Sequence, residues 1–119
     1  MPFRAYALPV WWAACFALTH LSFGPSLGPQ LPLIDKFVHF TLYLGLAVLW
    51  RVRRAARVRP QGGAAAATFF AILLVYAAFD EISQAYVGRD TEALDFAADA
   101  LGAAAGLAFP LRRAARGTR

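Results

Sequence analysis

Four long apolar segments, separated by short polar connections, dominate this sequence. They cover about residues 6–23, 36–50, 64–86 and 94–111. An α-helix needs roughly 20 mainly apolar residues to cross the hydrocarbon core of a bilayer. The chain is 60% hydrophobic, whereas soluble domains contain roughly 45–50% apolar residues. The sequence therefore predicts an all-α protein in which a single domain, residues 1–119, forms a four-helix transmembrane bundle.

The charged residues divide between the two ends of these segments. Ten of the twelve cationic side chains are arginines at residue 4, between residues 51 and 59, and after residue 111, whereas all seven acidic residues lie at the opposite ends. Arginine-rich connections of membrane proteins stay in the cytoplasm. We therefore expect a multi-pass protein of the bacterial inner membrane, with both termini cytoplasmic and the acidic end on the extracytoplasmic side.

The excess of positive charge does not indicate nucleic-acid binding. The net charge is +5, but the arginines flank apolar segments instead of lying among polar surface residues and exposed aromatic side chains. Membrane lipid is therefore an expected partner and nucleic acid is not. The single cysteine, Cys15, lies inside an apolar segment and is most simply a small apolar side chain.

Ionisable side chains inside the apolar segments mark the candidate site. At about 1.5 Å of helix rise per residue, His39, Asp80 and Asp99 lie roughly 5–9 Å inside the outward ends of their segments. Residues four apart project from the same face of a helix. Three such pairs occur: Asp35 with His39, Asp80 with Gln84, and Asp95 with Asp99. We therefore expect three helices to direct polar faces toward a common cavity.

Buried charges at these depths need partners. A charged side chain in the middle of a span costs about 2.5–3.5 kcal/mol on insertion scales. Five or six in one layer would cost on the order of 10 kcal/mol, which is comparable with the stability of a whole domain. Helix capping does not explain Asp80 or Asp99, which lie well inside their segments. We expect these side chains to neutralise one another, to be hydrated or to bind a ligand.

The remaining polar residues of this end also have simpler explanations. Asp35 stands where a helix N-cap is expected, and Asp95 complements the dipole at the start of its helix. Lys36 can extend its amine to the membrane interface. His20 is more typical of an interface residue than of a ligand. The sequence does not decide between these explanations and a role of the same residues at the site.

Two glycines continue the polar face of the fourth segment. Gly102 and Gly106 follow Asp95 and Asp99 at spacings of three and four residues. Small residues at such positions allow two helices to approach closely. The spacing predicts close helix packing next to the polar layer, for which an alanine-rich contact is a sufficient explanation.

These polar residues resemble the signature of the VanZ-like family of small bacterial integral membrane proteins. The resemblance covers about residues 35–106 and depends on the order and spacing of separate motifs. The matching residues are Asp35, Lys36, His39 and Tyr43, then Asp80, Glu81 and Gln84 in a D-E-x-x-Q motif, then Arg89, and then Asp95, Gly102 and Gly106. Where many members have asparagine, this chain has Asp99, which adds a charge. The resemblance implies a helical membrane protein of the cell envelope, in a family named after a member linked to resistance against glycopeptide antibiotics of the teicoplanin type.

One functional hypothesis is an enzyme that acts on a phosphorylated or ester-linked lipid at the outer leaflet. General acid–base catalysis needs a titratable side chain at the reacting bond, and a divalent cation can assist it. The expected catalytic residues are Glu81, His39 and Asp80, and a divalent cation would take Asp80, Asp95, Asp99 and His39 as ligands. The expected ligand-binding residues are Lys36, Arg89, Gln84 and Tyr43. Arginine in particular suits bidentate phosphate binding.

Two further hypotheses involve no chemistry. In one, the polar cavity binds or transports an envelope lipid or a cell-wall precursor. Four short spans are few for an alternating-access transporter unless the protein forms a homo-oligomer. In the other, the charges form a structural ion-pair network that joins three helices. The sequence leaves all three hypotheses open, and it identifies no cofactor beyond the divalent cation.

Overall fold

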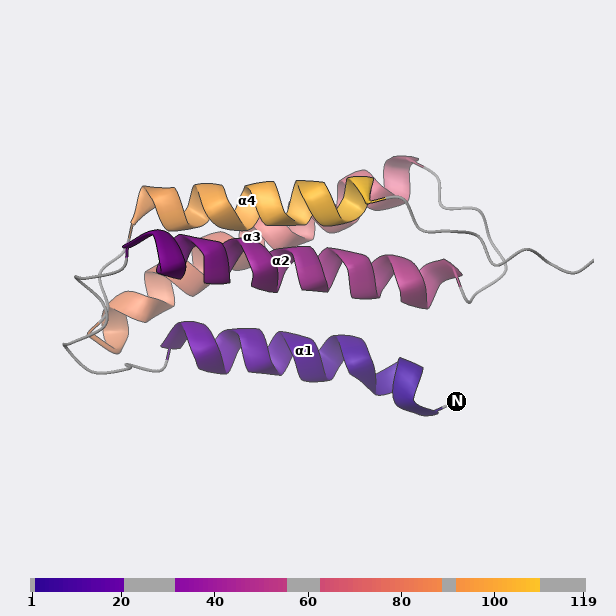
Figure 1. Cartoon of the computed structure of the whole chain (residues 1–119), viewed down its shortest axis with the longest axis horizontal. Coiled ribbons are helices and arrows are strands. Elements are labelled where there is room, and N and C mark those ends of the chain that lie inside the picture. The colour runs from indigo at the N-terminus through magenta and orange to yellow at the C-terminus, as the bar shows by residue number, and fades with distance from the viewer. Residues whose placement is uncertain (1, 21–31, 56–62, 89–91, 110–119) are drawn as a thin grey trace, which may run out of the picture.

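A computed structural model describes residues 2–20, 32–55, 63–88 and 92–109 of the chain. These residues form four helices, α1 (Pro2–His20), α2 (Pro32–Ala55), α3 (Gly63–Tyr86) and α4 (Ala93–Ala108), and they include no strand. The prediction of an all-α protein with four helices is confirmed. Figure 1 shows α2 between α1 and α4, with α3 crossing behind them. The end of α1, the start of α2, the end of α3 and the start of α4 gather at one end of the bundle.

The second helix is longer at both ends than the apolar segment from which it was predicted. It begins at Pro32, where a proline at the first helical position costs little because the missing N–H would have no helical partner. It continues through Arg51, Arg53 and Arg54 to Ala55, because arginine is a good helix former and cations are favourable at a helix C-terminus. Asp35 therefore lies in the first turn of α2 and is not its N-cap.

One helix is a candidate membrane span by its length and composition. Of the helices within the described residues, α3 alone combines the length and the apolar composition that a span requires. The described part of α4 is 16 residues long, which is short of the roughly 20 residues that cross a bilayer. The four-span arrangement and the side on which the termini lie stay predictions.

Two glycines bring α4 unusually close to α2. A Cβ atom on Gly102 would lie 2.1 Å from the carbonyl oxygen of Phe40, and one on Gly106 would lie 2.6 Å from that of Leu44. The close packing predicted from the spacing of these glycines is therefore confirmed. It brings the polar faces of the two helices together at the acidic end.

The first helix is fixed to α2 by one tryptophan. Trp11 Nε1 donates a hydrogen bond to the carbonyl oxygen of Leu42 at 3.0 Å. Its ring lies against Gly45, where an added Cβ would be 2.6 Å from ring atoms. Cys15, predicted to be a small apolar side chain, is buried in the core with Leu42. These contacts place the end of α1 beside the polar faces of α2 and α3.

Besides its apolar core, the bundle combines buried charged side chains with an apolar outer surface. Large apolar side chains are exposed on all four helices, including Tyr6, Phe37, Val75 and Leu101. Val75 on α3 is 73% exposed, whereas Asp80 on the same helix is fully buried. Soluble proteins rarely bury unpaired charges or expose apolar surface on every side. This distribution is the one expected where lipid surrounds the helices.

Candidate functional site

A buried polar layer lies at the acidic end of the bundle and receives side chains from all four helices. Its buried members are Thr19 on α1, His39 on α2, Asp80, Glu81 and Gln84 on α3, and Asp95 and Asp99 on α4. Local sequence explains how each helix contributes, because the polar residues on α2, α3 and α4 recur at spacings of three or four and so share one face. The structure thus brings together side chains that lie up to 80 positions apart in the chain.

Lys36 joins the start of α2 to the start of α4. Its Nζ donates to Glu92 Oε2 at 2.6 Å and to Asp95 Oδ1 at 2.9 Å. Glu92 is half exposed and Asp95 is buried, so Lys36 spans from the rim of the layer to its interior. Its amine is therefore held by two carboxylates and does not simply extend to the interface.

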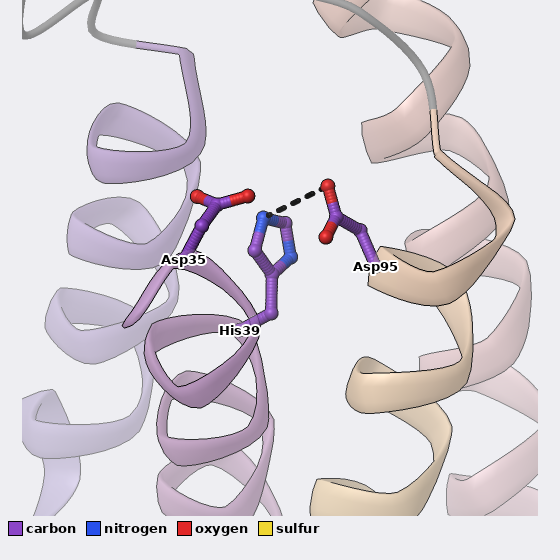
Figure 2. Close-up of side chains that lie close together, drawn as sticks. All are labelled: Asp35, His39 and Asp95. Atoms are coloured by element: carbon purple, nitrogen blue, oxygen red, sulfur yellow. Dashed lines mark ion pairs between the residues drawn. The ribbon is translucent and has the colours of Figure 1, made fainter. Parts of the chain in front are cut away.

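The imidazole of His39 lies between the carboxylates of Asp35 and Asp95 (Figure 2). His39 Nε2 is 3.9 Å from Asp95 Oδ2, which is longer than a hydrogen bond. The three residues offer ligand atoms within 4.8 Å of one another. Asp95 is thus engaged by Lys36 and faces His39, so its role is not limited to complementing the helix dipole.

On its inner side, His39 contacts Asp99. His39 Nδ1 and Asp99 Oδ1 are 2.8 Å apart, and both side chains are almost completely buried. The second oxygen of this carboxylate, Asp99 Oδ2, has no hydrogen-bond partner among the described residues. The Tyr43 hydroxyl, one helical turn beyond His39, is also buried without a described partner. Buried polar atoms are nearly always hydrogen-bonded in folded proteins, so each of these two atoms can take a further partner, such as a water molecule or a ligand.

Asp80 is held by neutral donors and one histidine. Thr19 Oγ1 donates to Asp80 Oδ1 at 2.8 Å, and Gln84 Nε2 donates to Asp80 Oδ2 at 3.1 Å. His20 Nδ1 lies 3.5 Å from Asp80 Oδ1, and its Nε2 lies 2.7 Å from Ser83 Oγ. The structure therefore places His20 against the site. Sequence reasoning missed Thr19, because one hydroxyl in an apolar segment has no periodic signal. Its position beside His20, at the outward end of that segment, was the available clue.

Glu81 lies beside the main cluster, at a groove between α3 and α4. Its Oε2 accepts a hydrogen bond from the backbone N–H of Glu92 at 3.3 Å, whereas its Oε1 has no hydrogen-bond partner among the described residues. The groove has a volume of about 270 Å³ and is lined by Ala78, Glu81, Ile82, Glu92, Ala93 and Phe96. Ile82 is strongly exposed on α3. The groove therefore connects the apolar outer surface with a buried carboxylate.

The polar layer carries more acid than base within the described residues. Six carboxylates lie in or beside it, from Asp35, Asp80, Glu81, Glu92, Asp95 and Asp99, together with one lysine and two histidines. Arg89, which the sequence predicts to bind an anion, lies outside the described residues. Carboxylates in such proximity require protons or a bound cation between them. The described layer is thus suited to cations and to hydrogen-bond donors.

Comparison with protein families gives a match for this chain. The family model VanZ/LLP1 matches residues 1–112, which is nearly the whole chain. The chain belongs to the VanZ-like family. Neither the curated proteins nor the solved structures gave a match. The motif resemblance seen in the sequence is therefore confirmed, and the VanZ-like motifs coincide with the polar layer, because His39, Asp80, Glu81, Gln84 and Asp95 are all buried there.

Membership of the VanZ-like family agrees with the surface of the bundle. The family is one of membrane-associated proteins, and α3 is apolar and long enough to span a membrane. In this VanZ-like protein the buried layer offers titratable groups, candidate metal ligands and a groove open to the outer surface. These features permit head-group binding, metal binding and proton transfer.

Proposed function

We propose that the chain is a multi-pass inner-membrane protein that binds the head group of an envelope lipid or of a cell-wall precursor at its polar layer. The groove between α3 and α4 carries the proposal, because it leads from the apolar surface of the helices to the Glu81 carboxylate. A lipid diffusing in the bilayer would reach this groove sideways, with its chains still in hydrocarbon. Capture of such a molecule would connect this protein with glycopeptide resistance, in which cell-envelope components are the target.

The lining of the groove matches an amphiphile. Ala78, Ile82 and Phe96 supply apolar walls, and Glu81 supplies a carboxylate with one unpartnered oxygen. At about 270 Å³, the groove lies at the lower limit of small-molecule pockets, which measure about 300–1,000 Å³. It therefore suits part of a head group, such as one that donates hydrogen bonds to a carboxylate. Lys36, which donates a hydrogen bond to Glu92 at the rim of the groove, would supply a cation to a phosphate bound next to the groove.

Filling the groove should remove the bound lipid. We expect Ile82→Trp to reduce lipid retention several-fold, because the larger side chain occupies space on the wall of the groove. Val75→Trp is the matched control, since Val75 is exposed on the same helix and does not line the groove. Native mass spectrometry of protein extracted in mild detergent measures the lipid adducts. Equal retention by both variants would contradict the proposal.

A charge-removing variant separates binding from a structural ion-pair network. Glu81→Gln keeps the shape of the side chain and the backbone contact with Glu92 but removes the charge. A structural network predicts a lower melting temperature with unchanged lipid binding. The binding proposal predicts weaker lipid binding with an unchanged melting temperature.

A metal-assisted hydrolase or transferase acting on a phosphorylated or ester-linked lipid is the second candidate. The observation in its favour is the convergence of His39, Asp80 and Asp99, three residues that can hold a metal ion. The same lipid extracts distinguish it from a binding protein. An enzyme would accumulate a cleaved or transferred product in cells that produce the wild-type chain and not in cells that produce the Asp80→Asn variant. A binding protein would leave the lipid intact in both.

The orientation in the membrane has its own test. We expect Val87→Cys, at the exposed turn after α3, to react with a membrane-impermeant maleimide in intact cells, because the acidic end faces outward in the proposal. Gly63→Cys, at the exposed start of α3, should react only after permeabilisation. The native Cys15 is buried and gives little background. Labelling of the Gly63→Cys variant in intact cells would reverse the proposed topology.

A further inference from the structure

Three buried side chains from three helices converge at the centre of the polar layer. His39 on α2, Asp80 on α3 and Asp99 on α4 each offer a ligand atom, and these atoms lie within 4.8 Å of one another. Their exposed fractions are 1%, 0% and 0%. Helix packing at Gly102 and Gly106 keeps α2 and α4 in close contact next to this cluster. The donors are thus held by the core of the bundle and not by mobile surface side chains.

The cluster consists of two carboxylates and one imidazole, and a second imidazole, that of His20, has its Nδ1 3.5 Å from Asp80 Oδ1. Asp80 receives hydrogen bonds from the neutral donors Thr19 and Gln84, and Asp99 Oδ1 lies 2.8 Å from His39 Nδ1. Buried carboxylates repel one another unless a proton or a cation lies between them.

Two unpartnered atoms provide an independent indication of a ligand. Asp99 Oδ2 is buried without a hydrogen-bond partner among the described residues, and so is the hydroxyl of Tyr43. Leaving such an atom unsatisfied costs about 1–3 kcal/mol, and more for a charged group. Tyr43 is 1% exposed and interacts electrostatically with both Asp80 and Asp99. A cation at this point would satisfy the Asp99 oxygen and could accept a lone pair of the neutral Tyr43 hydroxyl oxygen.

We propose that His39, Asp80 and Asp99 bind one divalent transition-metal ion, of the Zn²⁺ or Mn²⁺ class. One imidazole nitrogen and two carboxylate oxygens suit these ions, whereas Ca²⁺ requires six to eight oxygen ligands. Donors on opposite sides of an ion with bonds of about 2.0–2.2 Å are at most about 4.4 Å apart. Donors in a tetrahedral site are about 3.3–3.6 Å apart, so ligand atoms that lie within 4.8 Å of one another need to close by no more than about 1.5 Å. Tyr43 or a ligand entering the layer takes the next coordination position.

Neighbouring residues support this site. Thr19 and Gln84 orient Asp80 by donating to its two oxygens, and such outer partners typically increase metal affinity. The second group of candidate ligands, Asp35, His39 and Asp95, shares His39 and lies toward the start of α2 and α4 (Figure 2).

Metal titration of the whole chain tests this inference. The purified protein in detergent is stripped with a chelator, and Zn²⁺ binding is then measured by calorimetry and by elemental analysis. We expect one ion per chain for the wild type. Asp99→Asn should weaken binding at least about 100-fold, since it removes a ligand and not only an outer partner. Asp35→Asn is the matched control and should bind nearly as the wild type does.

Each result bears on the location of the ion. Loss of binding in the Asp35→Asn variant with normal binding in the Asp99→Asn variant would place the ion between Asp35 and Asp95 and overturn the proposal. Circular dichroism checks that each variant folds. If the Asp99→Asn variant does not fold, Asp80→Asn replaces it, because Asp80 belongs to the proposed ligand group alone whereas His39 belongs to both groups. Pulsed electron paramagnetic resonance of the wild type with Mn²⁺ then tests whether a histidine nitrogen is coordinated. Less than one tenth of an ion per folded chain, or no nitrogen coupling, would contradict the proposal.

The proposed metal site and the proposed lipid binding can be contradicted independently of each other. Lipid retention is measured in the same stripped and metal-loaded samples. Lipid that remains without bound metal would leave the proposed function intact and remove the metal site. One bound metal ion per chain without retained lipid would support the metal site and contradict the proposed function.

Discussion

Replacing Gly102 with alanine should destabilise the protein by more than about 3 kcal/mol, beyond the usual range for overpacking of about 1–3 kcal/mol. The added Cβ would lie 2.1 Å from the carbonyl oxygen of Phe40 and 2.9 Å from its carbonyl carbon. Backbone atoms cannot rotate aside as a flexible side chain can, so α2 and α4 must separate. The same interface carries the contact between His39 and Asp99. The substitution should therefore loosen the polar layer as well.

Thermal unfolding in detergent, followed by circular dichroism, measures this effect. A loss of about 3 kcal/mol corresponds to a decrease of about 10 °C in melting temperature for a chain of this size. Gly63→Ala is the matched control, because no atom lies within 4 Å of its added Cβ. Alanine is the better helix former by roughly 1 kcal/mol. A Gly102→Ala variant with a higher melting temperature would show that helix propensity outweighs the close contact, and that α2 and α4 are farther apart than described.

Removing the imidazole of His39 should destabilise the protein by about 3–5 kcal/mol, which is the usual effect of breaking a buried pair by deleting one partner. His39→Leu leaves both Asp99 oxygens without a hydrogen-bond partner among the described residues, since Oδ1 contacts His39 and Oδ2 has none. The double variant His39→Leu/Asp99→Leu removes both polar groups. It should regain most of the lost stability, because replacing a buried pair by apolar residues is often neutral or stabilising.

The comparison is made in chelator, so that metal does not contribute to the stability. The Asp99→Leu single variant completes the double-mutant cycle and isolates the interaction between the two side chains. An additive cycle would contradict the inference that His39 and Asp99 act as a pair. If the double variant keeps its melting temperature but loses lipid or metal binding, the pair serves function and not stability.

Local sequence was sufficient to predict the helices and part of their packing. The apolar segments and the spacing of Gly102 and Gly106 are properties of one helix, and the structure bears out both. The ends of α2 were less well predicted, because the predicted segment ended where the apolar residues end. A helix, however, continues for as long as its residues favour helical backbone, and so α2 includes Arg51 and two further arginines.

Thr19, which belongs to no periodic pattern, was not predicted, and His20 was considered more typical of an interface residue than of a ligand. Thr19 bonds to Asp80, 61 positions away, and His20 contacts Ser83, 63 positions away. A hydroxyl at the end of an apolar segment resembles any other small residue in sequence. Its importance appears only when α1 is placed beside α3. The groove between α3 and α4 likewise belongs to two helices and has no counterpart in either segment.

The sequence by itself determined that the chain is helical, that its acidic residues gather at one end of the helices, and that it carries the VanZ-like motifs. Those features follow from composition and from spacing along single helices. The tertiary structure decided which side chains meet: His39 with Asp99, Lys36 with Asp95, and Thr19 with Asp80. The partners in each pair lie about sixty positions apart. The physical reason is that spacing fixes the face of a helix that carries a residue, whereas the rotation of each helix toward its neighbours is set by packing, here by Gly102, Gly106 and Trp11.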